Sequence, residues 1–222
     1  VALHGGTVLS TLVVFWKDIV KLFRGLFRFE MNEETKFLLR IAVSLIPIMV
    51  VGLTCKDLVE GLFTGNLWIV GSMLLLTALL LWTSSRKVAV PNYQPKKFTY
   101  WRAFVIGIAQ AVAVLPGLSR SGSTISTGLL LGVDRTQMAK FSFLMVLLPI
   151  IGANLLEVMD GKFTALPKSE IVPLVTGFLT SFVVGAIACK WMVKLVSKGN
   201  LKWFALYCLV VGLVALTAAC IR

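Results

Sequence analysis

The sequence is poor in acidic side chains and histidine, and its few cysteines are not grouped as in metal or disulfide sites. Ten Asp and Glu oppose 22 Lys and Arg among 222 residues, and there is one histidine. The four cysteines, Cys55, Cys189, Cys208 and Cys220, are scattered through apolar stretches without a C-x-x-C pair. We therefore expect neither a zinc site nor a disulfide framework.

The chain also lacks the alternating polar and apolar pattern of β-strands. Instead, 58% of its residues are hydrophobic, and they form repeated runs of about 20 residues, the length at which a helix crosses a bilayer. This pattern predicts an all-α integral membrane protein, a polytopic helical bundle that forms a single membrane domain over residues 1–222. The net charge of +12 lies between the apolar segments. In these positions the Lys and Arg residues orient the helices and contact anionic lipid headgroups, so no nucleic-acid partner is expected.

The apolar runs predict where the chain crosses the membrane. Full spans are expected at 37–55, with a kink at Pro47, and at 62–83, 141–156, 171–189 and 203–221. The first run, Val1 to Trp16, is short for a span, and residues 17–29 carry basic side chains at helical spacing, as in a helix that lies in the membrane interface. Because the chain begins at Val rather than Met, we expect its beginning to be missing.

Loop charges indicate how the interrupted apolar stretch 103–132 meets the membrane. Three loops are rich in Lys and Arg: 17–40, 84–102 and 190–202. The loop 17–40 also carries four acidic residues, but only in the loops 56–61 and 157–170 do acidic residues outnumber basic ones. The positive-inside rule places the basic loops in the cytoplasm, and counting spans places the connection 133–140 there too. Residues 103–132 must then enter and leave by one face, which predicts a re-entrant helix hairpin with PGLSRSG at its tip.

The tip of this hairpin gathers hydrogen-bond donors. They are the guanidinium of Arg120, the hydroxyls of Ser119, Ser121, Ser123 and Thr124, and the N–H groups of a helix expected to start near Gly122. Such donors suit a phosphate group. The alternative is that these small residues serve helix packing, with Ser121 or Ser123 as a helix N-cap and Gly128 and Gly132 at a helix contact. That alternative leaves an arginine at membrane depth unexplained.

The same segment has the spacing of a nucleotide-binding P-loop. Gly117 to Thr124 reads G-x-x-x-x-G-S-T, with Ser123 in place of the phosphate-binding lysine. A P-loop also follows a strand, and none is predicted here. Nucleotide binding is therefore not expected.

The motif resembles one protein family specifically. The segments AQAVAVLPGLSRSGSTISTGLLLGVDR and FSFLMVLLPIIGA are similar to the second signature region of the undecaprenyl pyrophosphate phosphatases, also called BacA. A looser similarity extends from Val1 to the C-terminus. The resemblance implies a bacterial inner-membrane hydrolase that cleaves a polyprenyl diphosphate to the monophosphate. This reaction recycles the carrier lipid of peptidoglycan synthesis and confers bacitracin resistance.

The resemblance also assigns residues. It implies catalytic roles for Arg120, Ser119 and Thr124. It implies diphosphate binding by the neighbouring small residues: Ser121, Gly117, Gly122 and Ser123.

The family's first signature has no counterpart in this sequence. That signature is rich in Glu, ends in Ser-Ser-Thr-Gly-His and is linked to a divalent cation, Mg²⁺ or Ca²⁺. We therefore assign no metal ligand in this chain, and part of the active site is expected to lie outside it. Glu157 and Asp160 are expected to be solvated, and His4 to serve helix packing. The spans resemble the second half of an inverted repeat whose first half is incomplete.

Other functions stay open at this point. A transporter or flippase that moves a polyprenyl phosphate lipid would use the same anion site, and a scaffold bundle would have no site at all. The nucleophile, the general base, the lipid chain length and the oligomeric state, including a homodimer, are not determined by the sequence.

Overall fold

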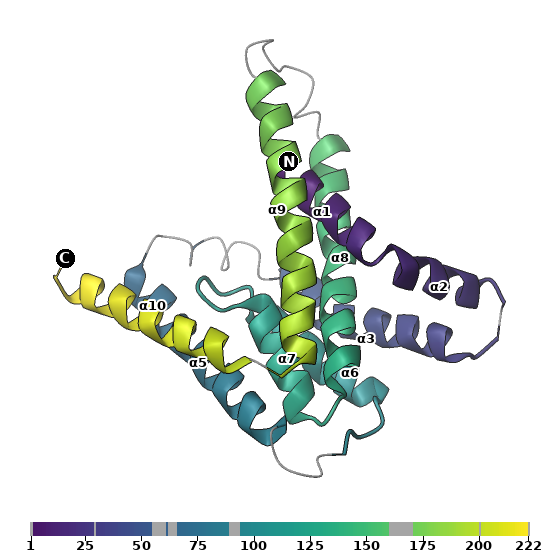
Figure 1. Cartoon of the computed structure of the whole chain (residues 1–222), viewed down its shortest axis with the longest axis horizontal. Helices are drawn as coiled ribbons and strands as arrows, with labels where there is room; N and C mark the ends of the chain where they lie inside the picture. The colour runs from purple at the N-terminus through teal and green to yellow at the C-terminus, as the bar shows by residue number, and fades with distance from the viewer. Residues whose placement is uncertain are drawn as a thin grey trace. The chain divides into compact units, whose positions relative to one another are not determined.

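The protein is helical throughout the part that the structure describes. The computed structural model describes residues 2–28, 30–54, 61, 66–88, 94–159, 171–199 and 201–221, and all regular secondary structure within them is helical (Figure 1). Four of these helices are long and apolar enough to cross a membrane: α3 (Glu33–Thr54), α5 (Leu67–Val88), α9 (Ile171–Ser197) and α10 (Leu201–Ile221). The prediction of a polytopic all-α membrane protein is confirmed.

The remaining described helices are α1 (Ala2–Val14), α2 (Trp16–Leu26), α6 (Tyr100–Val112), α7 (Arg120–Leu130) and α8 (Arg135–Met159). The chain divides into two compact units, one of residues 1–38 and 143–194 and the other of residues 39–142 and 195–222. The single membrane domain and the inverted repeat stay predictions.

In the first unit, small residues allow α1 and α9 to approach closely. A side chain on Gly6 would overlap Ser181 Oγ and the carbonyl of Phe178, and one on Gly185 would lie 2.7 Å from Ser10 Oγ. Membrane helices associate through such small residues, because lipid supplies no hydrophobic force between them.

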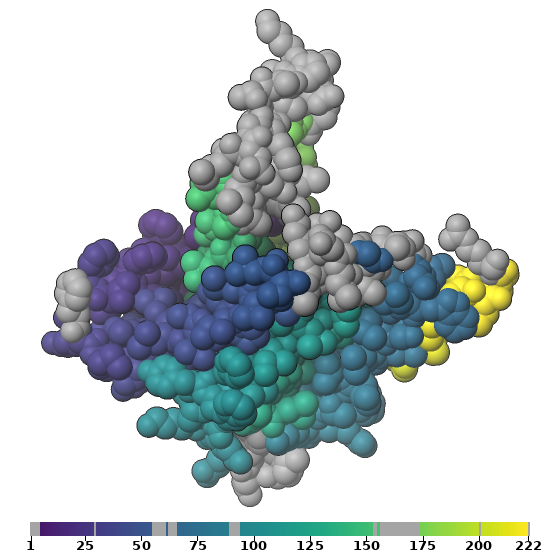
Figure 2. Space-filling model, turned by 180° about the vertical axis from the view of Figure 1, so that it is seen from behind, coloured from purple at the N-terminus to yellow at the C-terminus, as the bar shows by residue number. Residues whose placement is uncertain are grey.

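In the second unit, α5 packs along α10, and Figure 2 shows the two side by side. A Cβ on Gly71 would lie 3.2 Å from the carbonyl oxygen of Gly212, and a Cβ on Gly212 would lie 3.2 Å from that of Gly71. The two backbones therefore nearly touch at this pair. The pairing holds α5 in place, and α5 in turn supports α7.

Helices α6 and α7 are too short to cross a membrane. They have 13 and 11 residues, which at about 1.5 Å per residue is well below the roughly 30 Å hydrocarbon thickness. They are joined by residues 113–119 and pack against each other and, through α7, against α5. This is the helix pair expected over 103–132, and its entry and exit by one membrane face stays a prediction.

Several predicted boundaries are wrong because the apolar run marks only part of each helix. Helix α5 continues past Thr83 to Val88, and the hydroxyls of Ser84 and Ser85 donate to carbonyls of their own helix at 3.0 and 2.8 Å. Helix α8 begins at Arg135, where Asp134 Oδ1 accepts N–H bonds from the next turn. Helix α9 extends through much of the expected loop 190–202.

Some expectations lie outside the described residues. They concern Cys55, most of the loop 56–61, Asp160 and residues 161–170, and the side chains of His4 and Glu157.

Candidate functional site

The tip of the α6–α7 pair is organised by Ser119, which caps α7. Its backbone is extended, and its Oγ accepts the N–H of Gly122 at 3.1 Å. Its carbonyl accepts the N–H of Ser123 at 2.8 Å. Helix α7 thus starts at Arg120, two residues before Gly122, near which its start was predicted, and the alternative caps Ser121 and Ser123 are wrong because Ser119 is the cap.

This cap leaves an anion-binding arrangement at the start of α7. The N–H groups of Arg120 and Ser121 have no acceptor within the described part of the chain, as is usual at the first positions of a helix. They lie at the positive end of the helix dipole. The Ser119 hydroxyl accepts through its oxygen and still has its own proton to donate. The Arg120 side chain is exposed and forms no ion pair with any described residue.

A residue of α5 that the sequence analysis missed holds the tip in place. The N–H of Ser119 donates to Thr77 Oγ1 at 3.1 Å, and Thr77 is fully buried and donates in turn to the carbonyl of Met73 at 3.0 Å. Thr77 is the lone hydroxyl in the run LLLTALLLW. A polar side chain isolated in a span is a functional signal that would have found it.

Thr124 lies within α7 and links it to the first turns of α8. Its side chain is buried, its Oγ1 donates to the carbonyl of Arg120 at 2.9 Å, and its Oγ1 lies 2.7 Å from the Oγ of Ser142. Thr124 is therefore well placed to fix the orientation of Arg120, four residues earlier on the helix.

The hydroxyl group of Ser123 lies next to these residues and lacks a hydrogen-bond partner in the described part of the chain. Its Oγ is buried and finds no partner in the described ranges, and the same is true of Gln110 Oε1 on α6. A buried polar atom without a partner costs free energy, and such atoms are rare in folded proteins. A phosphate oxygen or a water molecule would satisfy the Ser123 hydroxyl.

The two predicted glycines shape the backbone at the tip. Gly117 has φ +91°, and a Cβ there would lie 2.5 Å from the carbonyl oxygen of Val70. A Cβ on Gly122 would lie 3.0 Å from Ser119 Oγ and 3.1 Å from Thr77 Cγ2. Gly117 therefore excludes a side chain, and a side chain at Gly122 would be tight, so the loop can turn and rest on α5.

The donor set fits an anion and does not fit a metal ion. Arginine, hydroxyls and N–H groups surround the tip, whereas Mg²⁺ and Ca²⁺ are held mainly by carboxylate oxygens. Among the residues that the structure describes, no three His, Cys, Asp or Glu side chains come together. The structure thus brings the predicted residues 117–124 into one compact tip, and their separate catalytic and binding roles stay predictions.

Comparison with known proteins identifies similar sequences. The family model described as bacitracin resistance protein BacA matches residues 1–214. An undecaprenyl-diphosphatase of Parabacteroides distasonis is 52% identical over 223 residues, which cover 99% of this chain and 82% of the relative. That of Christiangramia forsetii is 49% identical over 219 residues, with coverages of 99% and 81%. That of Methanosphaera stadtmanae is 36% identical, with coverages of 96% and 81%.

Proposed function

The chain belongs to the bacitracin resistance protein BacA family, and on this premise we propose that it hydrolyses undecaprenyl diphosphate to the monophosphate and inorganic phosphate. The names of its relatives support this activity directly. The apolar helices place the protein in the bacterial inner membrane as a multi-pass protein. There the reaction recycles the carrier lipid of cell-wall synthesis and confers resistance to bacitracin.

One observation supports the proposal at the level of chemistry: at the start of α7, the guanidinium of Arg120 and the first N–H groups have no partner among the residues that the structure describes. In the reaction, a water oxygen bonds to the terminal phosphorus while the bond from that phosphorus to the bridging oxygen breaks. The bridging oxygen stays on the lipid monophosphate. Negative charge spreads over the transferring phosphoryl group, and fixed cations and donors stabilise it.

Three side chains of the tip have a part in this proposal: those of Ser119, Arg120 and Thr124. Arg120 binds two phosphate oxygens through its planar fork. The Ser119 hydroxyl and the first N–H groups of α7 donate to the same phosphate. Thr124 positions this turn through its contact with Ser142. Attack by a serine oxygen would need an adjacent base, and the described residues of this tip supply none.

A divalent cation, Mg²⁺ or Ca²⁺, is the proposed cofactor, on the strength of the family resemblance. The residues of the tip do not fit such an ion, so no step of the reaction is assigned to it here. We also propose a homodimer. The outer face of α10 exposes large apolar side chains that suit either lipid or a second copy, including Trp203, Tyr207 and Val214. Mass photometry of the solubilised protein measures the oligomeric state.

Phosphate release and lipid translocation distinguish the proposed enzyme from a flippase. The full-length protein is reconstituted in liposomes with undecaprenyl diphosphate, and both inorganic phosphate and the leaflet position of the lipid are followed. The proposal predicts stoichiometric phosphate release that saturates with substrate. Translocation without phosphate release would contradict it.

A further inference from the structure

A charged cavity lies within the first unit, away from the α7 tip. It has a volume of about 470 Å³, in the usual range for ligand sites, and four basic residues of α2 and its C-terminal end line it: Lys17, Lys21, Arg24 and Arg28. One carboxylate, that of Glu34, lies opposite them. The excess of positive charge indicates an anionic ligand.

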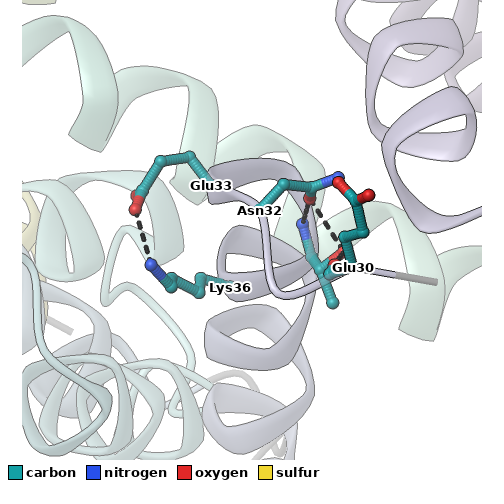
Figure 3. A network of polar contacts seen from close by, with 5 residues as sticks. Glu30, Asn32, Glu33 and Lys36 are labelled. Carbon is teal, nitrogen blue, oxygen red and sulfur yellow. Dashed lines mark hydrogen bonds and ion pairs between the residues drawn. The ribbon is translucent and has the colours of Figure 1, made fainter. Parts of the chain in front are cut away.

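The wall of the cavity that faces α2 is formed by the segment where α2 connects to α3. Asn32 Oδ1 accepts the N–H and the hydroxyl of Thr35, both at 2.8 Å, and so caps α3 (Figure 3). Asn32 Nδ2 donates to the carbonyl of Gly25 at 2.9 Å. Gly25 is buried and has no room for a side chain against Glu34. These contacts join α2 to α3 on this side of the cavity.

Most of the positive charge in the cavity is not neutralised. Lys21 is bridged to Glu34 at 3.2 Å, but Lys17, Arg24 and Arg28 form no salt bridge with any acidic residue of the described ranges. The four basic residues recur at intervals of four, three and four, which places them on one side of the helix. They converge on the cavity from that side.

The side of α2 next to this basic side is apolar and exposed. Phe23 and Phe27 are 56% and 72% exposed, and Trp16, which also lines the cavity, is 62% exposed. A helix with large exposed aromatic side chains on one side and Lys and Arg on the other lies in the membrane interface, with its apolar side among the acyl chains. The cavity is then at the level of lipid headgroups, and the loop charges place it at the cytoplasmic leaflet.

We infer that this cavity binds the phosphate group of an anionic phospholipid headgroup. The cations supply charge, the arginine forks match phosphate oxygens, and the salt bridge of Glu34 holds Lys21 at the rim. The site is independent of the proposed hydrolase activity, because it uses none of the residues of the α7 tip. Free inorganic phosphate has the same chemistry but would not need the exposed apolar side of α2.

Native mass spectrometry of the full-length protein, with phosphatidylglycerol or phosphatidylcholine added to the detergent, tests the site. The wild-type protein is expected to retain phosphatidylglycerol preferentially. The variant Arg24→Gln/Arg28→Gln should bind it roughly 30-fold more weakly, because two cations at an anionic surface are lost. The control Lys190→Gln/Lys194→Gln removes two exposed cations of α9 and should bind it as the wild type does.

A third variant reverses the sign of the effect. Glu34→Gln removes the one carboxylate and frees Lys21, so it should bind phosphatidylglycerol roughly fivefold more tightly. A merely structural role of this corner would not strengthen binding.

Other results would overturn the inference. They are equal retention of the two lipids, equal losses in the α2 and α9 variants, or displacement of the lipid by excess inorganic phosphate, which would assign the cavity to the soluble ion. Phosphate release by Arg24→Gln/Arg28→Gln in detergent should equal that of the wild type, which separates this site from the proposed activity.

Discussion

The bond between Thr77 and the N–H of Ser119 gives a prediction whose size follows from the structure. Thr77→Val keeps the shape and branching of the side chain but removes the oxygen that accepts this N–H at 3.1 Å. A buried donor left without a partner costs about 1–3 kcal/mol. If the whole of this free energy is added to the activation barrier of the reaction, turnover falls by about 5- to 150-fold, since each 1.36 kcal/mol is tenfold in rate.

Ser119 is only partly buried, so water can replace part of the lost bond, and we expect a loss of about tenfold. The assay is steady-state phosphate release from undecaprenyl diphosphate in detergent, with thermal unfolding measured on the same samples. Thr77→Ser keeps the hydroxyl and should retain most of the activity. Wild-type turnover in Thr77→Val, or equal losses in the two variants, would refute the idea that α5 positions the tip.

Three further predictions concern the tip and its cofactor. Gly117→Ala should destabilise the protein by at least about 1–2 kcal/mol, because alanine is strained at φ +91° and would press on Val70; Gly52→Ala, in open space on α3, is the thermal-unfolding control. Thr124→Val and Ser142→Ala should lower phosphate release to a similar extent if Thr124 acts by positioning, whereas a much larger loss in Thr124→Val alone would indicate direct contact with substrate. Chelation by EDTA should abolish phosphate release and added Mg²⁺ or Ca²⁺ should restore it; full activity in EDTA would remove the proposed cofactor.

The sequence predicted the helices and the position of the tip because both depend on local patterns. The apolar runs marked α3, α5, α9 and α10, and Pro116, Gly117 and Gly122 marked the break between α6 and α7. Helix ends were predicted poorly. Charged and hydroxyl residues continue a helix beyond the bilayer, as Ser84 and Ser85 do by bonding to their own backbone.

The partners of the tip could not be predicted, because they come from distant parts of the chain. Thr77 precedes Ser119 by 42 residues and Ser142 follows Thr124 by 18. No local pattern states which helix α7 packs against. The basic cavity was missed for a similar reason: the α2 charges were evident, but Asn32 and Gly25 join α2 to α3 by contacts that only the folded chain reveals.

The central claim is that Arg120 binds the diphosphate whose hydrolysis the protein catalyses. Its most direct test is phosphate release by the full-length Arg120→Ala and Arg120→Lys proteins at matched thermal stability. We expect Arg120→Ala to lose about 10²- to 10³-fold in turnover. Arg120→Lys should recover part of that loss, because lysine keeps the charge without the planar fork. Wild-type turnover in a folded Arg120→Ala protein would contradict the claim.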